Sequence, residues 1–183
     1  MTDNSLIAAL ALAVTKKPRA NLQQIAAMAG ISKATLYRIT PTREQLLEML
    51  YKKAETHIRN SLTDADLFSK HYKEALNCLI KNILAEKELY LFWVSALWID
   101  LGASKEIHLG GYNHSFLTQE LELFFKEGQR KGLFCIDMPA TWLAKSCDYL
   151  IYAAAESTQR GEIGSLSAPD FVEKMFLNGA SAI

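Results

Sequence analysis

One segment constrains this chain more than any other feature: residues 21–47, NLQQIAAMAGISKATLYRITPTREQLL. Asn21 can cap a first short helix, and the glutamine three residues later completes a capping-box pattern. Gly30 can adopt the left-handed backbone conformation that a sharp turn after a helix needs. Ser32 can cap a second helix, which Pro41 ends because the residue before a proline is disfavoured in a helix. The segment therefore predicts a helix-turn-helix followed by the start of a third helix.

The second helix of this pair carries side chains that suit the major groove of DNA. Basic side chains reach phosphates or guanine edges, hydroxyl groups bond to phosphates, and a small side chain permits contact with a thymine methyl group. Residues at helix N-termini add backbone N–H groups that favour phosphate. The predicted DNA-contacting residues are Asn21, Ser32, Lys33, Ala34, Thr35, Tyr37, Arg38, Thr42 and Arg43.

The same segment resembles the N-terminal domain of the TetR family of bacterial transcriptional regulators. The resemblance covers about residues 5–60 and follows the pattern IA-x-x-AGIS-x-x-TLYR-x-x-P-[ST]-[KR]-E-x-L. Thr40 stands where the family usually has a core phenylalanine, so Ile39 or Leu46 is expected to supply that packing. The matching residues are Ile25, Ala26, Ala29, Gly30, Ile31, Ser32, Thr35, Leu36, Tyr37, Pro41, Thr42, Arg43, Glu44 and Leu46.

Charge is divided unevenly along the chain. The 183 residues hold 20 basic and 20 acidic side chains, so the formal net charge is zero. Residues 1–60 contain nine Lys or Arg and four Asp or Glu, whereas residues 61–183 contain 11 and 16. A basic head on an acidic body favours nucleic acid as the partner. A membrane surface would attract the same charge, but no basic amphipathic helix with a bulky apolar face occurs in the head.

Composition and motif content exclude several other classes. Half of the residues are apolar, which predicts a folded core, and no apolar run reaches the ~18 residues of a membrane helix. Three widely spaced cysteines argue against a disulfide framework, so we expect the cytoplasm. No HExxH, Cys-x-x-Cys, GxSxG or glycine-rich phosphate loop occurs. We therefore predict neither enzymatic activity nor a bound metal or cofactor.

The whole chain is predicted to be all-α, with about nine helices. Residues 1–46 are expected to form the DNA-binding domain, with a helix at 43–61 as the link, and residues 47–183 the ligand-binding and dimerisation domain. Beyond the head, helices are predicted at 43–61, 67–84, 86–101, 104–131, 139–160 and 167–180.

The last two predicted helices carry broad apolar stripes. Two such helices from each of two subunits can form a four-helix bundle, and the family resemblance implies dimerisation here. Alternatively, the stripes pack into the core of the body. A dimer suits the DNA hypothesis, since two recognition helices related by a twofold axis read a palindrome. The predicted interface residues are Trp142, Tyr149, Ala153, Phe171, Met175 and Phe176.

Aromatic residues interspersed with polar ones are concentrated between residues 79 and 125. Ligand pockets are mostly apolar with a few polar groups, so this region is a candidate binding site. The alternative is that aromatic residues at helical spacing form the core. The candidate ligand-binding residues are Tyr90, Trp93, Trp98, His108, Tyr112 and Phe116.

These features together predict a dimeric, ligand-responsive regulator that binds double-stranded operator DNA. Its expected partners are a palindromic operator, a small-molecule effector and a second copy of the chain, with no membrane. That it represses, and is released by an inducer, is what the family resemblance implies. The alternative is a ligand-independent architectural DNA-binding protein, which a body without a pocket would favour.

Overall fold

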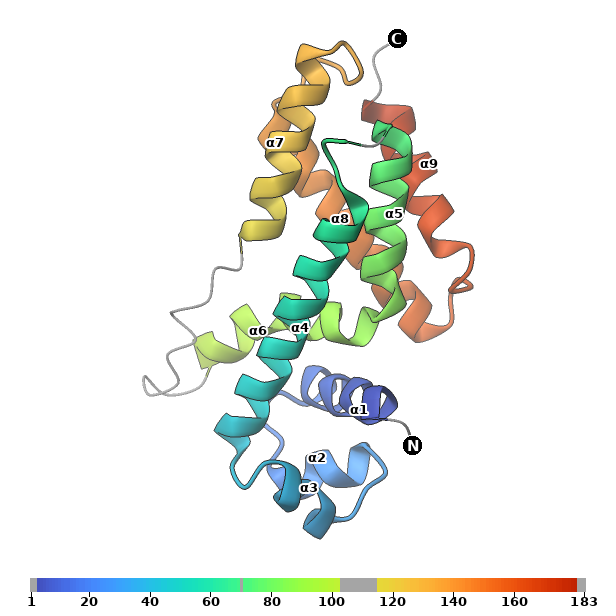
Figure 1. The fold of residues 1–183 in the computed structure, drawn as a ribbon. Coiled ribbons are helices and arrows are strands. Elements are labelled where there is room, and N and C mark those ends of the chain that lie inside the picture. Colours follow the sequence, from blue (N-terminus) through green and yellow to red (C-terminus); the bar gives the residue numbers. More distant parts are fainter. Residues whose placement is uncertain (1–2, 70, 103–114, 181–183) are drawn as a thin grey trace. The chain divides into compact units, whose positions relative to one another are not determined.

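The structure, a computed structural model, describes residues 3–69, 71–102 and 115–180. Within these ranges the chain forms nine α-helices, which confirms the all-α prediction (Figure 1). The helices are α1 (Asp3–Lys16), α2 (Leu22–Met28), α3 (Lys33–Ile39), α4 (Arg43–Ala65), α5 (Tyr72–Ala85), α6 (Lys87–Gly102), α7 (Phe116–Arg130), α8 (Ala140–Arg160) and α9 (Ala168–Ala180). None of the described helices is both long enough and apolar enough to cross a membrane.

The chain divides into two compact units. The first comprises residues 1–57 and 88–112, and the second comprises residues 58–87 and 113–183. The long helix α4 contributes residues to both units. The first unit therefore contains the predicted DNA-binding domain together with further residues of α4 and the described part of α6.

The core of the first unit is built where α1, α2, α3, α4 and α6 bring their apolar faces together. Leu10 and Val14 of α1 are fully buried, as is Leu36 of α3. Tyr51 of α4 is also fully buried, and its ring centroid lies 4.8 Å from that of Trp93 in α6. Burial of side chains of this size is the main favourable term that holds a small helical unit together.

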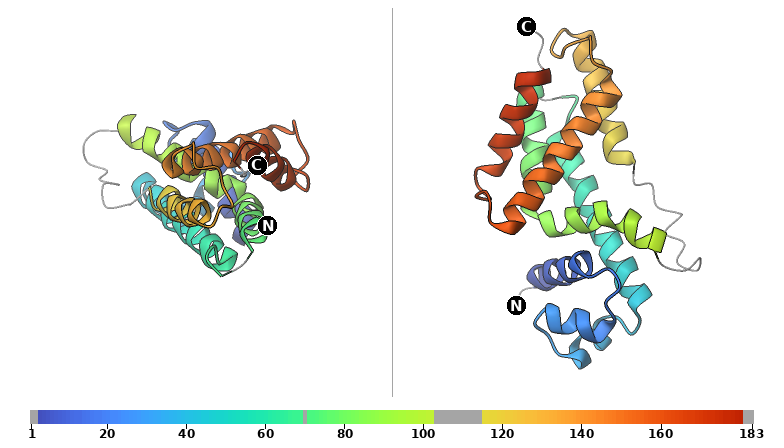
Figure 2. Two further views of the ribbon diagram at one scale, coloured as in Figure 1. Left: turned by 90° about the horizontal axis from the view of Figure 1, so that it is seen from above. Right: turned by 180° about the vertical axis from the view of Figure 1, so that it is seen from behind.

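The second unit packs α8 between α7 and α9, with α5 against α8 and α9 (Figure 2). Four phenylalanines form its centre. The ring centroid of Phe125 lies 4.9 Å from that of Phe134 and 5.1 Å from that of Phe176, and Phe124 lies 5.7 Å from Phe134. Tilted and edge-to-face aromatic pairs at these separations add to the stabilisation from burial alone.

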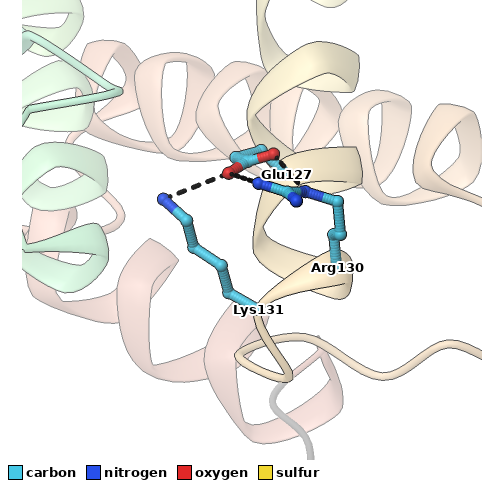
Figure 3. A network of polar contacts seen from close by, with 3 residues as sticks. All are labelled: Glu127, Arg130 and Lys131. Carbon is cyan, nitrogen blue, oxygen red and sulfur yellow. Dashed lines mark hydrogen bonds and ion pairs between the residues drawn. The ribbon is translucent and has the colours of Figure 1, made fainter.

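Charged residues at the end of α7 form a surface network. The Glu127 carboxylate accepts hydrogen bonds from Arg130 at 2.8 Å and pairs with Lys131 at 3.2 Å (Figure 3). Hydrogen bonds from Arg130 and then Lys131 lower the pKa of Glu127 from 4.5 to about 2. Helix α7 ends at Arg130, and Gly132 follows with a φ of 73°, the left-handed conformation that favours glycine.

Helix boundaries differ from the prediction around residue 66. The predicted helix 43–61 continues to Ala65, and the helix predicted from residue 67 begins at Tyr72. Asp66 has a φ of 49°, and its carbonyl accepts a hydrogen bond from Ser69 N–H, so the chain turns here. An aspartate tolerates this conformation better than most residues, and no glycine or proline marks the position in the sequence. Most of the predicted helical residues 104–115 lie outside the described residues.

Candidate nucleic-acid interface

Helix α2 begins with the predicted capping box. The Asn21 side chain accepts a hydrogen bond from Gln24 N–H at 2.9 Å, and Gln24 Oε1 accepts one from Asn21 N–H at 3.0 Å. Gly30 has a φ of 70°, which turns the chain after α2. Asn21 therefore specifies the start of α2 by satisfying N–H groups that the helix itself leaves unpaired.

Helix α3 begins with a second side-chain cap. The Ser32 hydroxyl accepts a hydrogen bond from Thr35 N–H at 3.0 Å and lies 2.9 Å from the Thr35 hydroxyl. Leu36 is the buried residue of this seven-residue helix. Helix α3 is thus anchored by the buried Leu36 side chain, and the Ser32 cap sets where it begins.

The rest of α3 presents polar and charged side chains to solvent. Lys33, Ala34, Tyr37 and Arg38 are exposed, while Thr35 is half-buried. The Lys33 ammonium lies 5.4 Å from the centre of the Tyr37 ring, within the range of a cation–π contact. The structure therefore brings the predicted residues of α3 onto one short helix with two cations, a phenol and a small side chain accessible.

Thr40, at the end of α3, is buried where the family usually has phenylalanine. Of the two residues expected to replace that packing, Leu46 is fully buried and Ile39 is 40% exposed. Among the described residues the Thr40 hydroxyl has no hydrogen-bond partner. A buried hydroxyl without a partner is destabilising, so Thr40 weakens the packing at the end of α3.

The start of α4 carries the last two predicted DNA-contacting residues. The exposed Thr42 hydroxyl accepts a hydrogen bond from Gln45 N–H at 3.2 Å and so caps the helix. The Arg43 guanidinium donates from Nε to the carbonyl of Ala20 at 3.2 Å and from a terminal nitrogen to the carbonyl of Pro18. No sequence pattern indicates these two bonds, because they join residues 23 and 25 positions apart.

The predicted ligand-binding residues are distributed over both units. Tyr90 and Trp93 are buried in the core of the first unit, with Trp93 against Tyr51. Trp98 lies in α6, but its side chain is outside the described part of the chain, and His108 and Tyr112 lie outside the described residues.

Phe116 belongs to the second unit, where it lines a cleft of about 420 Å³. The Arg59 guanidinium lies 4.1 Å from the centre of its ring. The cleft is also lined by Leu62 of α4, Phe68 of the following turn and Glu120 of α7. Aromatic, aliphatic and charged side chains thus meet in one open cleft that includes residues of α4.

The predicted dimer residues of α8 and α9 fall on two different faces. Phe176 is buried against Phe125 in the core of the second unit. The other five point to solvent: Trp142 (59% exposed), Tyr149 (69%), Ala153, Phe171 (49%) and Met175 (67%). Each helix therefore buries one apolar face inside the unit and leaves a second apolar face uncovered.

The capped helix pair and the exposed side chains of α3 define the class of protein: a helix-turn-helix DNA-binding regulator. No family model matches the chain. The HTH-type transcriptional regulator NfxB of Pseudomonas aeruginosa is 37% identical over 179 residues, which span 98% of this chain and 94% of that protein. The chain belongs to the TetR family of transcriptional regulators. It is thus a DNA-binding regulator of transcription from a non-enzymatic family.

Solved structures share the fold. The MbdR regulator from Azoarcus sp. CIB superposes with a TM-score of 0.71 at 20% identity, covering 97% of each chain. The TetR-like regulator LfrR from Mycobacterium smegmatis, in complex with proflavine, superposes with a TM-score of 0.60 at 20% identity. That match covers 98% of this chain and 96% of LfrR.

Proposed function

We propose that this protein is a dimeric repressor that a small molecule releases from a palindromic operator. The observation that carries the proposal is the outward face of α3, where Lys33, Tyr37 and Arg38 are exposed on a helix capped at its start. These side chains match the donors that read guanine edges and phosphates. Ala34 leaves room for close approach to a base, and Ser32 and Thr42 add hydroxyl groups for phosphate contacts.

Dimerisation supplies the second recognition helix that a palindromic operator requires. A single seven-residue helix contacts too few base pairs to find one site, whereas two helices related by a twofold axis read two half-sites. The uncovered apolar face of α8 and α9 supports self-association, since large apolar patches on a soluble chain mark interaction surfaces. We propose that Trp142, Tyr149 and Met175 lie at the centre of this contact.

A ligand that shifts α4 would couple the body to the DNA-binding head. The cleft beside Phe116 supports this route, because Arg59 and Leu62 of α4 line it directly. That LfrR has been solved with proflavine shows that one protein of this fold holds a small molecule. Half-sites on one face of DNA lie ~34–36 Å or a multiple apart, so a small change in the spacing of two recognition helices weakens binding. Reciprocity then requires that operator DNA weaken ligand binding by the same factor.

The proposal is tested by capturing genomic fragments with the purified protein and footprinting the fragments that bind. We expect protection of a short palindrome by two copies of the chain, and release when the inducer is added. Candidate inducers are screened by the shift they cause in the melting temperature, because a ligand that binds only the folded state raises it. Broad protection without a preferred sequence, and no ligand that raises the melting temperature, would instead indicate an architectural DNA-binding protein.

A further inference from the structure

The connection between α1 and α2 is a tight turn rather than a loose loop. The Lys17 carbonyl accepts a hydrogen bond from Ala20 N–H at 3.0 Å, which closes a β-turn over residues 17–20. Pro18 occupies the second position of this turn, where its restricted φ is favourable. The backbone of this segment is therefore well defined by its own residues.

Arg43 secures this turn to the start of α4. Its guanidinium donates hydrogen bonds to the carbonyls of Pro18 and Ala20. Because the Lys17 carbonyl accepts from Ala20 N–H, three carbonyls of residues 17–20 accept a hydrogen bond. The α1–α2 connection lies beside the beginning of α4 (Figure 1). Only arginine offers two donors in a rigid fork, and a lysine at this position would keep the charge without the paired geometry.

The turn carries a dense positive charge with no internal counter-charge. Lys16, Lys17 and Arg19 are all exposed, and residues 16–21 contain no acidic residue. In the described part of the chain, none of these three side chains has an acidic partner within ion-pair distance. The turn also leads directly into Asn21, the cap of α2, and α2 packs against α3.

The geometry points to a second phosphate-binding element: Lys17 and Arg19 contact the DNA backbone beside the recognition helix, and Arg43 is the positioning residue that holds their turn in place. The phosphate-contacting surface of the head thus extends beyond α3 to a turn that the helix-turn-helix motif does not include. Arg43 acts through the turn, since its Nε and one terminal nitrogen donate to backbone carbonyls within the protein. This inference rests on the DNA binding proposed above.

Salt dependence separates these roles. Affinity for a short duplex of random sequence, and for the footprinted operator, is measured between about 50 and about 200 mM salt, where each phosphate contact contributes about 0.9 to the slope. We expect Lys17→Gln and Arg19→Gln each to reduce the slope by about 0.9 and to weaken binding about tenfold at 50 mM salt. Lys81→Gln, which removes an exposed cation from α5, is the matched control and should leave the slope unchanged.

Arg43→Lys tests the positioning role. We expect Arg43→Lys to lower the salt slope of DNA binding although the charge is retained. Combined with Lys17→Gln and Arg19→Gln it should have no further effect, because the effects of coupled residues do not add. Circular dichroism and the melting temperature verify that each variant is folded.

Three outcomes would overturn the inference. An unchanged slope in both glutamine variants would remove the turn from the DNA surface while leaving the proposed function intact. Arg43 would itself be a phosphate contact if Arg43→Lys bound DNA like the wild type while Arg43→Gln reduced the salt slope by about 0.9. That reduction would then add to the reductions caused by Lys17→Gln and Arg19→Gln. A wild-type protein that binds neither duplex would overturn the proposed function and this inference together.

Discussion

The outward faces of α3 and of the α8–α9 pair are both exposed, yet their chemistry is opposite. The α3 face offers cations and hydroxyl groups around a small Ala34, whereas the α8–α9 face offers Trp142, Tyr149, Phe171 and Met175. A charged face matches a polyanion, and an apolar face matches another apolar surface. Exposure alone shows that each face is free to meet a partner, and side-chain chemistry indicates which kind.

The two faces also differ in how they are held. Helix α3 has seven residues, one buried anchor in Leu36 and an unpartnered hydroxyl at its end. Helices α8 and α9 have 21 and 13 residues and pack on an interlocked phenylalanine core. Local caps specify the short helix α3, while tertiary packing specifies the larger apolar face. Variants that change one face at a time separate these contributions.

The largest expected effect comes from placing charge on the α8–α9 face. A Tyr149→Glu, Met175→Glu double variant would bury carboxylates without partners in the proposed dimer, which is strongly unfavourable. We expect a monomer in sedimentation and a loss of operator affinity of about a hundredfold or more, because one recognition helix reads one half-site. Leu123→Glu, on the exposed face of α7, should leave both measurements unchanged. A double variant that stays dimeric would move the interface elsewhere.

Filling the space at Gly128, which lies against the phenylalanine core, should be the next largest effect. A Cβ at Gly128 would lie 2.3 Å from the Phe134 ring, which is itself buried. We expect Gly128→Ala to lower the free energy of unfolding by about 1–3 kcal/mol, measured by urea denaturation. Gly179→Ala, where a Cβ meets nothing within 4 Å, should be neutral or stabilise by up to about 1 kcal/mol. Equal stabilities for the two variants would contradict a tightly packed core.

Removing the cations of α3 should weaken operator binding without affecting stability. We expect Lys33→Ala and Arg38→Ala each to cost about tenfold in affinity, with the salt slope reduced by about one where a phosphate contact is lost. Fluorescence anisotropy across a salt series gives both quantities. Tyr37→Phe tests the hydroxyl alone, and retention of full affinity would assign the Tyr37 ring to packing under Lys33.

Relieving the buried hydroxyl of Thr40 should stabilise the packing of α3. Thr40→Val keeps the shape and removes an unsatisfied polar group, so we expect a gain of about 1 kcal/mol in the free energy of unfolding. Thr56→Val is the matched control, because the exposed Thr56 hydroxyl donates to the Lys52 carbonyl at 2.8 Å and loses a real bond. A destabilised Thr40→Val variant would show that this hydroxyl has a role in the folded state.

The smallest effect concerns pH. The pKa of Glu127 is lowered from 4.5 to about 2, so its ionised form stabilises the folded state above about pH 4.5. That contribution is lost as the pH falls through about 2. A carboxyl titration by NMR should place its midpoint well below that of an ordinary glutamate, and Glu127→Gln should barely change stability because the group lies on the surface. An ordinary midpoint would mean that the network of Figure 3 does not persist in solution.

Local chemistry made the head predictable, but it did not determine which residues are buried in the interior of the body. Asn21, Gly30 and Ser32 act within three or four residues of their own positions, so their roles follow from spacing. The boundary at Asp66 was missed because an aspartate in the left-handed conformation leaves no distinct pattern. The apolar stripe of α9 was predicted, but spacing did not separate buried Phe176 from exposed Met175, since neighbouring residues lie on adjoining faces.

The sequence by itself determined the helix content, the position of the helix-turn-helix and the residues that face outward from α3, because caps, turns and helical periodicity are local. Only the tertiary structure decided that Arg43 holds the turn of residues 17–20, that Leu46 is buried while Ile39 stays exposed, and that α8 and α9 each keep one apolar face uncovered. These features depend on contacts between residues far apart in the chain, and such contacts exist only once the helices have packed.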